Sequence, residues 1–204
     1  MFDVEGFILV GGASRRMGTD KAALVIDGRT SLQRVANALA AVASPVTLVG
    51  ARHEYDGVTL QNVPDVHEKW GALGGIHSAL ANAERDWALI VACDLPFVTS
   101  ELFERLKSFI SEGTDAIVPI QSDGRPQPLC ALYRRETCLP KAERLIAAGE
   151  HTPRALLARV RTRRIDFVEL SDLSGADDFF LNVNTPSDFQ QAQEFLRGKS
   201  SRPL

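Results

Sequence analysis

The fold is decided by the segment Phe7-Ile8-Leu9-Val10-Gly11-Gly12-Ala13-Ser14-Arg15-Arg16-Met17-Gly18-Thr19-Asp20-Lys21. Its first four residues form a continuous apolar run, which is typical of a strand buried on both faces. The run ends in a turn rich in glycine and cations, where backbone N–H groups can approach an anion closely. The spacing fits neither the Walker A pattern nor GxGxxG. We expect this turn to bind phosphate, the alternative being a solvated turn whose basic residues face water.

Strand-like and helix-like segments alternate along the rest of the chain. Strands are predicted at 46–49, 58–63, 87–92, 116–118, 129–133, 165–170 and 179–183, and helices at 32–40, 74–83, 100–110, 139–148, 153–159 and from 185 onward. Ser31 is the expected cap of the first helix. This alternation predicts an α/β fold with a mainly parallel sheet covered on both faces. In such sheets ligands bind beyond the carboxyl ends of the strands.

Length, charge and cysteine content exclude several classes of protein. With 204 residues, of which 45% are hydrophobic, we expect one domain over 1–197 and a disordered tail over 198–204. A net charge of −3 disfavours a nucleic-acid partner. Cys93, Cys130 and Cys138 are too few for a disulfide scaffold, so buried thiols in a reducing compartment are expected. Because neither a signal peptide nor a membrane-spanning run is recognisable, we expect a cytoplasmic protein without membrane partners.

A second candidate site is Cys93-Asp94-Leu95-Pro96, which follows the most apolar predicted strand. The position places the Asp94 carboxylate at the same sheet edge as the glycine-rich turn. A carboxylate there suits Mg²⁺, which takes one or two protein oxygens and completes its shell with water and phosphate. The alternative is that Asp94 caps the turn before Pro96.

Three further places carry weaker signals. Asn182 and Asn184 lie two residues apart in a predicted strand and could present paired amides to one ligand, or could instead bond neighbouring loops. Asp65 could contact a nucleotide or serve as a turn residue. The run Gly71 to Gly75 precedes a helix N-terminus, a natural place for an anion. The basic run Arg159 to Arg164 is most often a solvated face, with acceptor-phosphate binding as the minority reading.

Taken together, these motifs resemble the molybdenum cofactor guanylyltransferase family, the MobA-like proteins of the nucleotidyltransferase superfamily. The matching segments span nearly the whole chain in the family's order and are Leu9 to Lys21, Asp65, Gly71 to Gly75, Cys93 to Pro96, Gln127-Pro128-Leu129 and Phe180 to Pro186. The first segment marks the wider superfamily, and its combination with the last is much more specific.

The resemblance implies a Rossmann-like three-layer fold of the nucleotide-diphospho-sugar transferase type. It also implies a Mg²⁺-dependent enzyme that transfers GMP from GTP to the phosphate of molybdopterin. The implied partners are GTP, the molybdenum cofactor, and proteins that insert molybdenum or act as molybdoenzyme chaperones. The residues implied are Lys21, Asp94 and Arg15 for catalysis; Leu9, Val10, Gly11, Gly12, Lys21, Asp65 and Asp94 for the nucleotide; Asp94 for the metal; and Gly74, Gly75, Asn182 and Asn184 for the acceptor.

The chain departs from the family pattern in two places. The family often has Gly-Pro-Leu where this chain has Gly71-Ala72-Leu73, and a frequent Asn after the second strand is replaced here by Val49 or Gly50. The contacts made at these two places in the family are therefore not transferred to this chain.

Three alternatives remain open from the sequence. A cytidylyltransferase acting on the same pterin tends to read Leu-Ala-Ala-Gly where this chain has Leu9-Val10-Gly11-Gly12. Sugar-phosphate nucleotidyltransferases usually place Pro after the motif's Lys, whereas Ala22 follows Lys21 here. From another class, a GTP-binding accessory protein would need no metal carboxylate or asparagine pair.

Overall fold

The computed structural model describes residues 2–10, 20–67, 70–183 and 188. Its central sheet is built from β1 (Val4–Leu9), β4 (Val46–Val49), β5 (Gln61–Val63), β6 (Trp87–Ala92), β7 (Ala116–Pro119), β8 (Cys130–Arg134) and β9 (Thr162–Ile165). The helices are α1 (Ser31–Ala40), α2 (Gly71–Asn82), α3 (Ser100–Ser108), α4 (Arg135–Ala147) and α5 (Pro153–Leu157), with short 3₁₀ helices η2 (Lys21–Ala23) and η4 (Phe167–Glu169). A small hairpin is formed by β2 (Val25–Ile26) and β3 (Arg29–Thr30).

The sheet confirms the prediction of a mainly parallel α/β fold. Its strand order is β5-β4-β1-β6-β8-β7-β9. The pairs β4–β5, β1–β4, β1–β6 and β7–β9 are parallel, and only β8 pairs antiparallel with its neighbours β6 and β7. The two predicted central strands, β1 and β6, are buried at every residue and pair with each other along their whole length.

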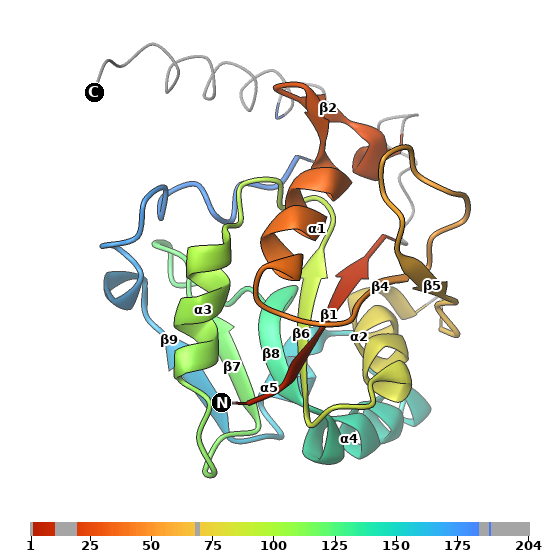
Figure 1. The fold of residues 1–204 in the computed structure, drawn as a ribbon. Coiled ribbons are helices and arrows are strands. Elements are labelled where there is room, and N and C mark those ends of the chain that lie inside the picture. The colour runs from red at the N-terminus through yellow and green to blue at the C-terminus, as the bar shows by residue number, and fades with distance from the viewer. Residues whose placement is uncertain (1, 11–19, 68–69, 184–187, 189–204) are drawn as a thin grey trace.

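Helices cover both faces of the sheet, as the unbroken apolar strands require. Figure 1 shows α1 and α3 together on one face and α2 with α4 on the other. The side chains divide in the same way, because alternate strand residues point to opposite faces. Ile8 and Leu89 belong to the core under α1 and α3, whereas Phe7 and Ile90 belong to the core under α2, α4 and α5.

The structure corrects several predicted elements. The segment 179–183 forms a turn at Phe179 and Phe180 and then irregular backbone instead of a strand. In the predicted strand at 165–170, only Ile165 belongs to a strand, as the last residue of β9, and η4 follows. Thr30, and not Ser31, caps α1, in a capping box with Gln33. The predicted helix from 185 onward lies outside the described residues, except for Asp188, which is helical.

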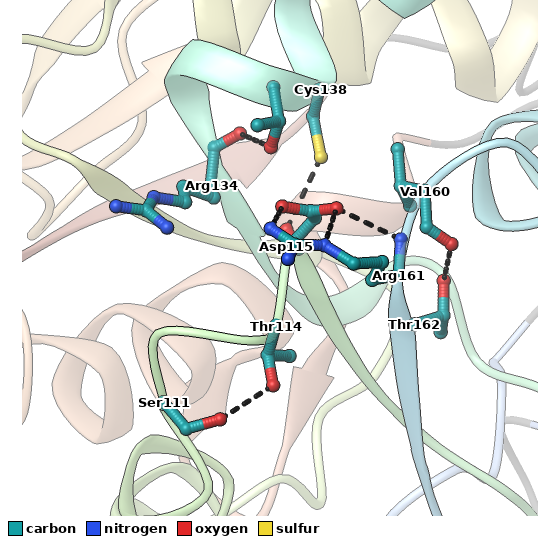
Figure 2. Close-up of polar contacts among 9 residues, drawn as sticks. Ser111, Thr114, Asp115, Arg134, Cys138, Val160, Arg161 and Thr162 are labelled. Carbon is teal, nitrogen blue, oxygen red and sulfur yellow. Dashed lines mark hydrogen bonds and ion pairs between the residues drawn. The ribbon is translucent and has the colours of Figure 1, made fainter.

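An ion pair fixes the far edge of the sheet, where β7 and β9 begin (Figure 2). The buried Asp115 carboxylate accepts hydrogen bonds from the backbone N of Arg161 at 3.0 Å and from its Nε and Nη2 at 3.0 and 2.9 Å. These bonds hold the pKa of Asp115 well below its ordinary value. Part of the predicted basic run therefore has a structural role: Arg161 joins two strands.

Two expectations about the chain as a whole can be compared with the structure. All three cysteines are free and buried, as expected, and burial raises the pKa of the Cys138 thiol to about 12. Within the described ranges, none of the helices combines the length and apolar character that crossing a bilayer requires.

Candidate functional site

The candidate site lies where the strand order reverses. From β1 the chain passes through α1 to β4 on one side, and later through α2 to β6 on the other side of β1. The carboxyl ends of β1 and β6 therefore flank a topological switch point, where ligands bind in open α/β sheets. The two ends are tied together, since Cys93 N donates to the carbonyl of Leu9 at 3.1 Å.

Two residues predicted to act together meet at this switch point. Nζ of Lys21, the first residue of η2, lies 3.7 Å from Oδ2 of Asp94, which follows β6. Each side chain keeps 23% of its surface exposed, so a ligand can reach both. Desolvation raises the pKa of Asp94, and Lys21 counteracts part of that rise. The site thus holds a partly desolvated carboxylate whose charge a cation would stabilise.

A small apolar cluster explains why distant segments converge here. Ile26 of the β2–β3 hairpin and Val183 are buried together, with the partly buried Leu24 and Phe97 packed against them. Leu24 and Ile26 follow Lys21 in the chain, Phe97 follows Asp94, and Val183 precedes Asn184. The hairpin turns at Asp27-Gly28, both with positive φ, as a two-residue hairpin loop requires.

The segment that carries the predicted residue Asn182 is joined to Asp94 by a backbone hydrogen bond. Val183 N donates to the carbonyl oxygen of Asp94 at 3.1 Å. The neighbouring Asn182 is exposed, so its amide is available to a ligand. Because 179–183 is not a strand, the argument that Asn182 and Asn184 share a strand face no longer applies.

Cys93, which lies between β6 and Asp94, is hydrogen-bonded to the first residue of α1 and is buried. The hydroxyl of Ser31, the buried first residue of α1, donates to the carbonyl of Cys93. The Cys93 thiol is buried, and desolvation with the nearby carboxylates of Asp94 and Asp20 raises its pKa well above the ordinary value. A buried thiol with a raised pKa is typical of a packing group.

Asp65, predicted to contact nucleotide, lies two residues after β5 and binds its own loop to α2. Its Oδ1 accepts from the backbone N of His67 at 3.0 Å and from the hydroxyl of Ser78 at 2.9 Å. Ser78 is fully buried and also accepts from Val66 N at 3.2 Å. One carboxylate oxygen is thus engaged in a turn, and Asp65 remains half-buried at the edge of the site.

Gly74 and Gly75, predicted to bind the acceptor, are buried in the first turns of α2. A Cβ at Gly74 would lie 2.5 Å from the carbonyl oxygen of His67, and one at Gly75 would lie 3.0 Å from Cδ1 of Leu9. Both glycines therefore allow α2 to pack closely on the switch-point strand and the Asp65 loop. The structure shows a packing role for Gly74 and for Gly75. Acceptor binding by these residues stays a prediction.

Sequence reasoning missed a polar cluster beside Lys21. Asp20 caps η2 through Oδ1, which accepts from Ala22 N at 3.0 Å, while its Oδ2 accepts from the Tyr55 hydroxyl at 2.6 Å. His53 Nε2 also lies 3.4 Å from this oxygen, and the His53 ring packs on Tyr55 at 4.5 Å. Asp20 belongs to the glycine-rich segment with which the sequence analysis began, but His53 and Tyr55 come from a loop that has no hydrophobic period to predict their partner.

The remaining predicted residues divide into two groups. Leu9 ends β1, and Val10 N donates to the carbonyl of Val49 at 3.0 Å, which places both at the switch point. Outside the described residues lie Gly11, Gly12, Arg15 and Asn184. Within the described ranges, no three His, Cys, Asp or Glu side chains gather as a protein-built metal cage would require.

Comparison with known proteins gives one consistent result. The model of the MobA-like NTP transferase domain matches residues 6–165. A molybdenum cofactor guanylyltransferase of Desulfosudis oleivorans is 32% identical over 95% of this chain and 96% of its own length. A probable molybdenum cofactor guanylyltransferase of Pelotomaculum thermopropionicum is 37% identical over 95% and 93%.

The solved structures agree with the sequence relatives. The molybdopterin-guanine dinucleotide biosynthesis protein A of Archaeoglobus fulgidus superposes with a TM-score of 0.79 at 27% identity, covering 95% of this chain and 99% of its own. The family model covers most of the chain, and curated relatives above 30% identity cover nearly all of it. The chain therefore belongs to the molybdenum cofactor guanylyltransferase family, whose members carry the MobA-like NTP transferase domain.

Proposed function

We propose that this protein transfers GMP from GTP to the phosphate of the molybdenum cofactor, with Mg²⁺, and releases pyrophosphate. The observation that carries the proposal is the approach of Lys21 to Asp94 at the switch point of the sheet. A cation suited to a polyphosphate lies beside a carboxylate suited to the metal ion that accompanies it. The choice of guanine and of the pterin acceptor is supported by the names of the relatives.

Asp94 fits Mg²⁺ because its hard carboxylate oxygens are partly desolvated, and the positive charge of Lys21, 3.7 Å from Oδ2, compensates only part of that desolvation. Since no other described acidic or histidine side chains complete a cage, the rest of the shell would come from phosphate oxygens and water. Bound there, the metal ion would supply positive charge to the triphosphate. Lys21 adds a second positive charge, and Arg15, which lies outside the described residues, is proposed to add a third.

The nucleotide is proposed to lie over the ends of β1 and β5. The backbone of Leu9 and Val10 leads directly into Gly11 and Gly12, whose small size suits close approach to the phosphates. Asp65 is proposed to use its second carboxylate oxygen for the nucleotide, since Oδ1 is already engaged with the turn.

The acceptor is proposed to approach from the α2 side. Trp70, at the N-cap of α2, makes no side-chain capping hydrogen bond, so the first-turn N–H groups of that helix suit an anion. Gly74 and Gly75 keep this turn close to Leu9 and His67. Asn182, exposed next to the Asp94 backbone contact, and Asn184 would complete the acceptor side.

The proposed reaction needs positioning more than proton transfer. An oxygen of the acceptor phosphate attacks the α-phosphorus of GTP, and the bond from that phosphorus to the β-bridging oxygen breaks, its electron pair leaving with pyrophosphate. The second pKa of a phosphate monoester is about 6, so the attacking oxygen is already mostly deprotonated at neutral pH. The main obstacle is repulsion, about 4 kcal/mol for each pair of unit charges 4 Å apart at an effective dielectric near 20. Lys21 is placed to reduce that repulsion.

Pyrophosphate release from GTP, Mg²⁺ and the molybdenum cofactor tests the proposal, with CTP and UTP as competing donors. The expected result is release that needs both GTP and the acceptor and that stops when Mg²⁺ is chelated. Faster release from CTP would replace the guanylyl assignment by a cytidylyl one. Tight GTP binding without any release would favour the accessory-protein alternative.

A further inference from the structure

We propose that Asp20 is a positioning residue. It links Lys21, the lysine proposed to bind the triphosphate, to the loop formed by residues 51–58. The inference rests on the proposed function, because it concerns how the same site binds its triphosphate. The two oxygens of the Asp20 carboxylate have separate tasks. Oδ1 holds η2, which begins at Lys21, and Oδ2 holds Tyr55 of the loop.

The first task fixes the backbone that carries Lys21. Asp20 Oδ1 accepts from Ala22 N at 3.0 Å, and the Asp20 carbonyl accepts from Ala23 N at 3.1 Å. Ala22 is fully buried in the core under α1, so η2 cannot shift without disturbing packing. The Lys21 side chain therefore extends toward Asp94 from a backbone that is held in place.

The second task fixes a loop at the neighbouring strand end. The loop 51–58 follows β4, which pairs with β1, and so lies at the carboxyl edge where the site is. Tyr55 donates to Asp20 Oδ2 at 2.6 Å. The His53 ring packs on Tyr55, with its Nε2 3.4 Å from the same oxygen. Tyr55 is half-buried, whereas the His53 side chain is 56% exposed and faces solvent at the site's rim.

Further hydrogen bonds hold the start of the loop and the residue that follows Tyr55. Asn62 bonds both backbone groups of Ala51, at 3.2 and 2.9 Å, and Gln33 Nε2 donates to the carbonyl of Asp56 at 2.9 Å. Among the described residues, the Tyr55 hydroxyl bond, with His53 beside it, links the middle of the loop to Asp20, the residue before Lys21. A loop anchored in this way is a preformed wall for the nucleotide, because its ordering cost is met before the ligand arrives.

Replacing Tyr55 by Phe and Asp20 by Ser isolates this link. Tyr55→Phe removes only the hydroxyl, while Asp20→Ser keeps a good cap for η2 and loses the bond to the loop. We expect each variant to raise the KM for GTP and the equilibrium Kd for GTP about threefold to tenfold, the range of one hydrogen bond, with kcat within about twofold. The double variant should be no weaker than the worse single variant, since both changes break the same link.

Thr114→Val is the matched control. It removes one hydroxyl hydrogen bond, to Ser111 at 2.8 Å, from a buried side chain at the opposite edge of the sheet. It should lower the melting temperature about as much as Tyr55→Phe does and leave GTP binding unchanged. Wild-type GTP affinity in Tyr55→Phe, or effects of the two substitutions that multiply in the double variant, would overturn the proposal. Because Kd is measured without acceptor, wild-type protein that binds GTP but releases no pyrophosphate would count against the proposed function alone.

Discussion

Nζ of Lys21 lies 3.7 Å from Oδ2 of Asp94, although a whole βαβ unit separates the two residues in the chain. The distance is that of a loose ion pair, longer than a direct hydrogen bond. Both side chains are partly exposed. Under the proposed function, a phosphate with its Mg²⁺ would enter between them and replace the pair by stronger contacts with each.

Asp94→Asn should abolish most activity while keeping the fold. The amide keeps the shape of the side chain but lacks the negative charge that Mg²⁺ prefers. We expect kcat/KM to fall about 10²–10³-fold or more, the range for loss of one electrostatic contact in a transition state. Pyrophosphate release at several Mg²⁺ concentrations measures the effect, and turnover equal to wild type at ordinary Mg²⁺ would remove Asp94 from the metal site.

The same variant makes a separate prediction about stability. Because burial raises the pKa of Asp94, the ionised form is less favourable in the folded state than in the unfolded state, so at neutral pH this group costs stability. Asp94→Asn should therefore melt at the same temperature as wild type or higher. A marked decrease in melting temperature would mean that the activity loss reflects misfolding. Stability gained with activity lost is the pattern expected of a functional carboxylate.

Lys21→Met should weaken the interaction with the triphosphate. Methionine keeps much of the apolar stem and removes the charge, so η2 should be preserved. Hydrogen bonds to charged groups contribute about 1.5–3 kcal/mol, which corresponds to a loss of about 10–150-fold in kcat/KM for GTP. Steady-state kinetics with GTP varied checks this. Unchanged GTP affinity together with unchanged turnover would show that Lys21 does not reach the nucleotide.

The sequence predicted the parts of this fold that rest on long apolar runs. The apolar runs at 7–10 and 87–92 predicted strands buried on both faces, and β1 and β6 are buried at every residue. That the two strands pair with each other was not predicted. The edge strand β9, Thr162-Arg163-Arg164-Ile165, was read partly as a basic run because two of its side chains are exposed. The segment 179–183 was expected to be a strand because Phe179 and Phe180 are apolar, but their burial comes from packing under α1 and α3.

The site was predictable only where topology dictates it. The rule that ligands bind beyond the carboxyl ends of parallel strands was enough to bring Lys21 and Asp94 together. The bond from Tyr55 to Asp20 could not be foreseen, because a loop of polar residues has no periodicity that fixes its partners. The same holds for the Val183 contact with Asp94, which depends on an irregular turn.

Alanine substitutions at Gly74 and Gly75 should differ in their effect on stability. The new Cβ meets backbone at position 74 and a flexible side chain at position 75. A Cβ at Gly74 meets the His67 carbonyl at 2.5 Å, and backbone cannot move aside easily, whereas a Cβ at Gly75 meets the end of Leu9 at 3.0 Å. We expect Gly74→Ala to destabilise the protein by about 1–3 kcal/mol through overpacking, and Gly75→Ala to cost less. Urea denaturation of both variants measures the difference. Equal stabilities would contradict the close contact between α2 and the Asp65 loop.

The Asp115–Arg161 pair should make the free energy of unfolding depend on pH in the acid range. Arg161 lowers the pKa of Asp115 in the folded protein, and the unfolded value is about 3.9. A depressed carboxyl pKa stabilises the fold above the unfolded value, and that contribution is lost as pH falls toward the folded value. Asp115→Asn should therefore cost about 2–3 kcal/mol at pH 7, since a buried carboxylate with three hydrogen bonds is replaced. At pH 3 and below, the difference between the two proteins should shrink.

Asp172→Asn supplies the comparison for this last prediction. Asp172 also bonds an arginine, Arg105, at 2.9 and 2.7 Å, and its pKa is also lowered by that partner. Its side chain is 65% exposed, however, against 3% for Asp115, so water and salt screen the pair. Denaturant unfolding at pH 7 and pH 3 should show a pH-dependent loss for Asp115→Asn and a far smaller one for Asp172→Asn. A loss at position 115 that stays constant across this range would show that packing, and not the carboxylate charge, holds β7 to β9.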